Sequence, residues 1–83
     1  MKYAVVSYWV GDTGDTELWL YDTENEAIEA LNRLWEQSYN LALEDEDFDE
    51  DNSYHEDNFA VVAWNELYRY FEVVKQNEKE VIR

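Results

Sequence analysis

The residues between positions 44 and 57, EDEDFDEDNSYHED, include nine acids and neither Lys nor Arg. Closely spaced carboxylates can bind a divalent cation, and the twelve residues from position 45 can be aligned to the calcium loop of an EF-hand. The oxygen ligands of that alignment would be Asp45, Asp47, Asp49, Ser53 and Glu56. Weak calcium binding is therefore one alternative for this acidic run.

The calcium alignment departs from an EF-hand in three ways. Its sixth position, where Gly permits a sharp turn, is Glu50, and its eighth, which is usually aliphatic, is Asn52. The residues that follow favour a strand, whereas an EF-hand continues into a second helix. Because a run this rich in acids matches the pattern easily by chance, we predict no EF-hand and no dedicated metal site.

Two other motifs could suggest catalysis. Asp12-Thr13-Gly14 spells the aspartic-protease triplet, but that chemistry needs two facing aspartates, and a glycine-containing turn is the simpler interpretation. His55 is the only histidine and the chain has no Cys, so a nucleophilic triad would depend on one residue inside the acidic run. We therefore predict that the protein is not an enzyme and uses no cofactor.

The elements that must position the acidic run begin with a hairpin. The segments from Lys2 to Val10 and from Glu17 to Tyr21 are rich in β-branched and aromatic residues, and both glycines of the chain lie between them. Thr23 and Glu26 then have the spacing of a helix capping box, and apolar residues follow at intervals of three and four. This pattern predicts an amphipathic helix from about Glu24 to Leu43.

A second hairpin is predicted after the acidic run. The segments from Phe59 to Trp64 and from Leu67 to Lys75 have strand composition, and Asn65-Glu66 between them fits a tight turn, although the usual following Gly is absent. The polar tail at 76–83 is expected to fray or to form a helical turn.

These elements predict a single α+β domain over residues 1–83. The expected order is β-β-α-β-β, with a four-stranded, mainly antiparallel sheet and the helix packed on one of its faces. Residues 44–57 are expected to form an acidic loop between the helix and the second hairpin.

The two faces of the predicted sheet are both apolar, which is unusual for an antiparallel sheet with one wet face. The first strand places Tyr3, Val5 and Trp9 on one side, and Ala4, Val6, Tyr8 and Val10 on the other. One helix covers one face only. We therefore expect a homodimer or another protein partner on the uncovered face, with a tail folded back over it as the competing expectation.

The composition narrows the classes of protein to which this chain could belong. The chain has 21 acids against 6 bases, a net charge of -15, yet 46% of its residues are hydrophobic and 17% aromatic, which is typical of a folding chain rather than an acidic disordered tail. No segment has the length of a signal peptide or membrane span, so we expect a cytoplasmic protein. The charge opposes direct binding to nucleic acid or anionic lipid.

With these alternatives set aside, we expect the acidic run to be a surface that binds a basic partner protein. Its charge profile is similar to that of small anti-restriction and anti-CRISPR inhibitors from phages and mobile elements, and this resemblance of size, acidity and α+β pattern implies DNA mimicry. The alternative is a structural or accessory domain that dimerises through its open sheet face, with a merely solvated loop. The expected partner-binding residues are Glu44, Asp45, Glu46, Asp47, Asp49, Glu50, Asp51, Glu56 and Asp57.

Overall fold

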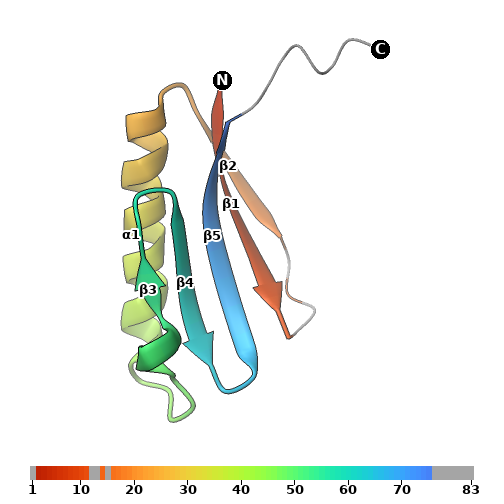
Figure 1. Cartoon of the computed structure of the whole chain (residues 1–83), viewed down its shortest axis with the longest axis vertical. Helices are drawn as coiled ribbons and strands as arrows, with labels where there is room; N and C mark the ends of the chain where they lie inside the picture. The colour runs from red at the N-terminus through yellow and green to blue at the C-terminus, as the bar shows by residue number, and fades with distance from the viewer. Residues whose placement is uncertain (1, 12–13, 15, 76–83) are drawn as a thin grey trace.

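A computed structural model of the chain describes residues 2–11, 14 and 16–75. It has an α+β fold, in which one helix packs on a five-stranded antiparallel sheet (Figure 1). The elements in chain order are β1 (Tyr3–Val10), β2 (Glu17–Tyr21), α1 (Glu24–Ala42), the 3₁₀ helix η1 (Glu50–Asn52), β3 (Tyr54–His55), β4 (Phe59–Trp64) and β5 (Leu67–Lys75). The predicted α+β class is therefore confirmed, and the predicted tail at 76–83 lies outside the described residues.

The strand order is β2-β1-β5-β4-β3, so the two predicted hairpins lie side by side. They are joined by an antiparallel pairing of β1 with β5, which runs from Tyr3 opposite Lys75 to Val10 opposite Tyr68. The centre of the sheet is thus made by strands that are far apart in the sequence.

The helix α1 begins at the predicted capping box. The Glu26 backbone N–H donates to Thr23 Oγ1 and the Thr23 N–H donates to Glu26 Oε1, both at 3.2 Å, which satisfies two amide groups that the first turn leaves without helical partners. The buried side of the helix is built from small and apolar residues, and Leu31 is its largest fully buried side chain. This side confirms the amphipathic pattern expected from the sequence.

The core lies between α1 and one face of the sheet. Val5 of β1, Phe71 of β5 and Val62 of β4 have no exposed surface, and they pack with Leu31 and the alanines of the helix. The alternation of strand side chains places their neighbours in sequence on the opposite face. Within the described residues no helix or strand covers that second face.

The fifth strand corrects the predicted count of four. Tyr54 and His55 pair with Val61 and Ala60 of β4, so the acidic segment contains a short edge strand. The sequence signal was weak because this strand has two residues and a polar neighbourhood, and its pairing depends on β4 instead of on its own composition.

Within the described part of the chain, no helix has both the length and the hydropathy needed to cross a membrane.

Candidate functional site: an acidic surface at one end of the molecule

The acidic segment is held along the outer edge of β4 by backbone hydrogen bonds. The Asn65 N–H donates to the Asp47 carbonyl at 3.0 Å, and the Asp49 N–H donates to the Ala63 carbonyl at 2.9 Å. Between these two contacts, Phe48 forms an isolated antiparallel bridge with Trp64. The backbone that carries the carboxylates is therefore part of the sheet edge.

Ser53 links the turn of this segment to β4. Its hydroxyl donates to the Asp49 carbonyl and accepts from the Ala63 N–H, both at 2.8 Å. The Asn52 side-chain amide also donates to the Asp49 carboxylate, at 2.6 Å. Asn52 and Ser53, which the calcium alignment placed inside a metal loop, instead fix the turn around Asp49.

An aromatic cluster anchors the segment to the helix. Phe48 is half-buried, and its ring meets Tyr39 edge-on with 5.2 Å between ring centroids. Tyr39 packs on Trp35 at 4.7 Å, and the edge of His55 meets Trp35 at 4.6 Å. Rings packed in this way contribute about 0.5–1.5 kcal/mol per pair beyond their buried area. His55 is thus part of the anchoring cluster.

Tyr39 also contacts the acidic segment through its hydroxyl, which donates to Glu50 Oε2 at 3.3 Å. Burial of the ring raises the pKa of Tyr39 above its ordinary value, and the negative charge of Glu50 together with this hydrogen bond raises it further. The hydroxyl therefore stays protonated at neutral pH and remains a donor to Glu50.

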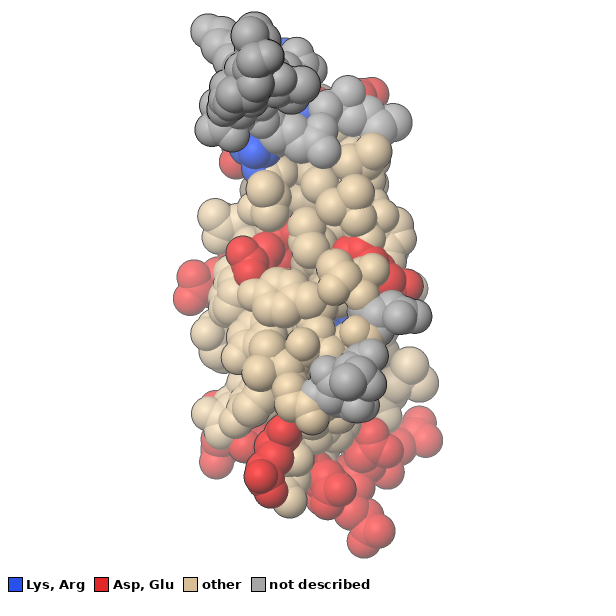
Figure 2. All heavy atoms as spheres, turned by 90° about the vertical axis from the view of Figure 1, so that its right-hand side faces the viewer, with Lys and Arg blue, Asp and Glu red and all other residues tan. Residues whose placement is uncertain are grey.

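Most of the predicted partner-binding carboxylates point to solvent. Eight of the nine belong to exposed residues, and only Asp49 is half-buried. None of the nine forms an ion pair with a Lys or Arg of the described chain, where the ion pair found joins Arg69 to Glu17. Figure 2, which views the molecule from the side away from α1, shows acidic side chains gathered at the lower end, where the loop after α1 lies in Figure 1. Seven of the nine predicted residues belong to this end and are called the acidic surface below: Glu44, Asp45, Glu46, Asp47, Asp49, Glu50 and Asp51. The other two, Glu56 and Asp57, lie in the β3–β4 turn at the opposite end of β4, where the Glu56 N–H donates to the Phe59 carbonyl, so the structure does not bring them together with the seven.

A hollow with an aromatic wall lies beside the acidic surface. The Trp64 indole N–H donates to Asp45 Oδ2 at 3.0 Å, and the Trp64 ring stacks on Trp9 with 5.6 Å between centroids. The residues that line the hollow are Trp9, Asp45, Glu46, Asp47, Trp64, Asn65 and Leu67. Carboxylates and indole rings therefore share one concave surface.

The described residues hold no group of three or more acidic or histidine side chains arranged to share a metal ion. The weak calcium alternative at Asp45, Asp47, Asp49 and Glu56 therefore has no assembled ligand set there. Of the Asp12-Thr13-Gly14 triplet, Asp12 and Thr13 lie outside the described residues, and Gly14 lies against the ring of Trp9.

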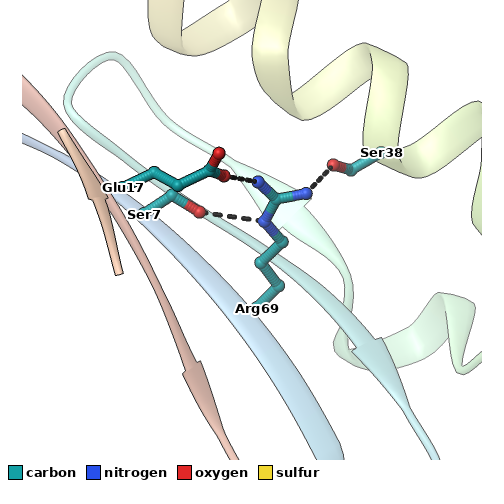
Figure 3. A network of polar contacts seen from close by, with 4 residues as sticks. All are labelled: Ser7, Glu17, Ser38 and Arg69. Atoms are coloured by element: carbon teal, nitrogen blue, oxygen red, sulfur yellow. Dashed lines mark hydrogen bonds and ion pairs between the residues drawn. The ribbon is translucent and has the colours of Figure 1, made fainter. Parts of the chain in front are cut away.

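The positively charged guanidinium of Arg69 makes its contacts within the fold (Figure 3). Its guanidinium donates to Ser7 Oγ at 2.9 Å, to Ser38 Oγ at 2.9 Å and to Glu17 Oε1 at 2.8 Å. It also lies over the rings of Trp9, at 5.3 Å, and Phe71, at 4.9 Å. A cation on β5 thus ties β1, β2 and α1 together and does not neutralise the acidic surface.

This network was not predicted from the sequence, although two signals pointed to it. Ser38 interrupts the apolar stripe of the helix, and Ser7 occupies an inward position of the first strand. Both are buried, and a buried hydroxyl requires a hydrogen-bond partner. The chain has 6 Lys and Arg residues, and the hydrogen-bond donor available to both hydroxyls was an Arg on another strand that faces the helix.

Comparisons of the chain with protein-family models, with curated proteins and with solved structures found no match.

Proposed function

We propose that the protein is a non-enzymatic binding protein whose acidic surface engages a basic surface of a partner protein. The observation that carries this proposal is the set of six exposed acidic residues at one end of the molecule, which form no ion pair with a described Lys or Arg and lie on a backbone fixed to the edge of β4. The sharpest form of the proposal is DNA mimicry. The partner is then a nucleic-acid-binding protein, and the carboxylates take the place of phosphates in its groove.

The fixed backbone supports recognition over simple solvation. A solvated run that only promotes solubility has no need of defined geometry. Here the backbone hydrogen bonds of Asp47 and Asp49 and the packing of Phe48 hold the segment before any partner arrives. Preorganisation of this kind lowers the conformational entropy that binding would otherwise cost.

The hollow beside Trp9 and Trp64 supports a partner that presents arginine. A guanidinium group forms paired hydrogen bonds with carboxylates and packs against aromatic rings, so it fits a hollow lined by carboxylates and indole rings. The carboxylates of Asp45, Glu46 and Asp47 line that hollow together with the two rings. Proteins that bind the DNA backbone use arginine in this role.

The proposal is tested by a charge-matched pair of variants. Glu46→Gln/Asp47→Asn/Asp51→Asn removes three exposed charges from the acidic surface, at side chains that form no hydrogen bond within the segment. Glu24→Gln/Glu29→Gln/Glu36→Gln removes the same charge from the exposed side of α1. Each protein is immobilised and exposed to a nuclease-treated lysate of its native cells, and captured proteins are identified by mass spectrometry.

We expect the unmodified protein and the helix variant to capture a nucleic-acid-binding protein that the acidic-surface variant loses. Added duplex DNA should displace the captured protein. Capture should also weaken steeply between 0.1 and 0.5 M salt, because exposed charges are screened over about 10 Å at 0.1 M. Capture that survives the acidic-surface substitutions, or that DNA does not displace, would contradict the proposal.

A further inference from the structure

The face of the sheet opposite α1, called the open face below, carries most of the exposed apolar surface of the described chain. Seven large hydrophobic residues are markedly exposed, and five of them lie on this face. Their exposed fractions are 48% for Val10, 56% for Leu18, 42% for Leu20, 48% for Tyr54 and 42% for Val74. The other two, Leu41 and Leu43, lie at the end of the helix.

Aromatic rings form a continuous row across the open face. Tyr8 of β1 stacks on Tyr70 of β5 at 5.3 Å, Tyr70 meets Phe59 of β4 at 5.7 Å, and Phe59 meets Tyr54 of β3 at 6.2 Å. Tyr68 extends the row along β5, at 6.2 Å from Tyr70. Rings that pack on one another in this way lose little side-chain entropy when a partner covers them.

The open face is nearly uncharged, although the protein has a net charge of -15. In the strands described, its one charged residue is Glu72, and the Tyr8 hydroxyl donates a hydrogen bond to the Glu72 carboxylate. The view in Figure 2 shows mostly uncharged surface above the acidic lower end. A face of this kind has little charge to attract a basic partner, and it is suited to contact with another apolar surface.

We propose that two copies of the chain pack through their open faces as a symmetric dimer, with the acidic ends pointing in opposite directions. A two-fold axis brings the same patch of each copy together, so two faces that each carry one carboxylate, that of Glu72, meet. The opposed orientation separates the two acidic surfaces by at least the length of a strand. The result is a two-sheet sandwich in which α1 lies on the outside of each sheet.

The size of the open face suits a dimer of this kind. Five strands at a spacing of about 4.8 Å are about 24 Å wide, and eight residues at about 3.3 Å make β1 about 26 Å long. The five strands together have 30 residues, so the flat area of the face is roughly 480 Å² per copy, to which protruding side chains add. The total of roughly 950 Å² of flat sheet, with the protruding side chains added, lies near the lower limit of about 1,000 Å² for a specific protein–protein interface.

The dimer is tested by measuring the mass of the full chain in solution at 10–100 µM with light scattering after gel filtration. The chain has a mass of 10.0 kDa, so we expect twice that value. Leu18→Gln/Leu20→Gln should shift the protein to the monomer. Leu41→Gln/Leu43→Gln, which makes the same change at two exposed leucines outside the open face, should leave the dimer unchanged. Circular dichroism confirms that each variant is folded.

A second measurement tests the orientation without weakening the interface. The chain has no Cys, so Asn65→Cys in the β4–β5 turn gives a single attachment point for a spin label near the acidic end. Opposed acidic ends should give a distance between the labels of roughly 25 Å or more, the length of the central strands. A shorter distance contradicts the opposed arrangement.

A monomer throughout the concentration range would overturn the dimer, and so would a dimer that both leucine variants leave intact or both disrupt. These outcomes are independent of the proposed function, because Leu18 and Leu20 lie outside the acidic surface. A monomer that still loses its partner on substitution of Glu46, Asp47 and Asp51 would remove the dimer and leave the acidic-surface proposal standing.

Discussion

At the scale of single residues, Arg69 determines how β1, β2 and α1 are held together. Its guanidinium gives one hydrogen bond to each of three different elements, and two of the acceptors, Ser7 and Ser38, are buried. The free energy of unfolding falls by roughly 1–3 kcal/mol when a buried hydroxyl loses its hydrogen-bond partner, whereas it can remain nearly unchanged when both partners are replaced by apolar groups.

The first prediction follows from this asymmetry. Arg69→Met keeps an apolar side chain against Trp9 and Phe71 but leaves both hydroxyls without their donor, so it should lower the free energy of unfolding by about 2–4 kcal/mol. Adding Ser7→Ala and Ser38→Ala should restore at least half of the loss. Urea unfolding followed by tryptophan fluorescence measures both values, and a triple variant that is no more stable than Arg69→Met would contradict the explanation.

The second prediction concerns Tyr8 and high pH. The hydrogen bond from Tyr8 to the Glu72 carboxylate, with partial burial and the charge of Glu72, raises the pKa of Tyr8 to about 12. The folded state thus holds this proton more tightly than the unfolded state, whose tyrosines have a pKa near 10. The stability that Tyr8 contributes is fully present below pH 10 and is lost as the pH rises through 12.

Absorbance at 295 nm follows tyrosinate formation and checks this prediction. Glu72→Gln keeps the ring of Tyr8 but removes the carboxylate, and should lower the pH at which the last tyrosines titrate. Tyr8→Phe should make the fall of the urea midpoint between about pH 10 and 12 shallower than in the unmodified protein. Identical titration curves for the Glu72 variant and the unmodified protein would argue against the contact.

At the scale of elements, the β4–β5 turn stores backbone strain next to the acidic surface. Glu66 has a φ of 63°, in the left-handed region, where a residue with a Cβ is disfavoured by roughly 1–2 kcal/mol. Gly11 of the other hairpin lies against the Glu66 carbonyl, so close that a Cβ at position 11 would come within 2.3 Å of that oxygen. The two hairpin ends are thus packed together.

The third prediction is that Glu66→Gly stabilises the protein by about 1 kcal/mol, because glycine adopts this φ without steric cost. Glu66→Ala removes the same charge but keeps the Cβ, so it serves as the matched control and should gain much less. Thermal unfolding by circular dichroism compares the two. Equal gains would show that the loss of charge, and not the relief of strain, is responsible.

The local elements could be predicted from the sequence, whereas the arrangement that anchors the acidic surface could not. The capping box at Thr23 and Glu26 and the strand composition of both hairpins act within a few residues. The pairing of β1 with β5 joins residues far apart in the chain, and nothing in their immediate neighbourhood specifies it. The docking of Phe48 on Tyr39 depends on how the segment after α1 folds back on the helix. The structure exposes eight of the nine predicted acidic residues and half-buries Asp49, and the fixed backbone beneath the acidic surface was found only in the structure.

At the scale of the whole molecule, charge opposes folding. Nine of the net fifteen negative charges are concentrated within fourteen residues, and mutual repulsion on this scale lowers the stability of the compact state. The structure gives these carboxylates no basic partners among the described residues.

The fourth prediction is that salt stabilises the protein. Raising NaCl from 0.05 to 0.5 M shortens the screening length below about 10 Å, so the melting temperature should rise. Glu46→Gln/Asp47→Asn/Asp51→Asn should raise the melting temperature at low salt and reduce its dependence on salt, and the matched α1 variant should do so less. A melting temperature that is insensitive to salt would mean that the repulsion is too small to matter.

The central pairing of β1 with β5 has a consequence for how the chain acquires its fold during synthesis. β5 leaves the ribosome after every other described element, and until then β1 and β4 have no central strand to join them. Until then the β1–β2 hairpin, the helix and the β3–β4 pair remain separate pieces, each with an apolar face exposed. A chain that stops before Leu67 therefore contains most of the residues of the domain but cannot close its sheet, and it should be an aggregation-prone target for proteases.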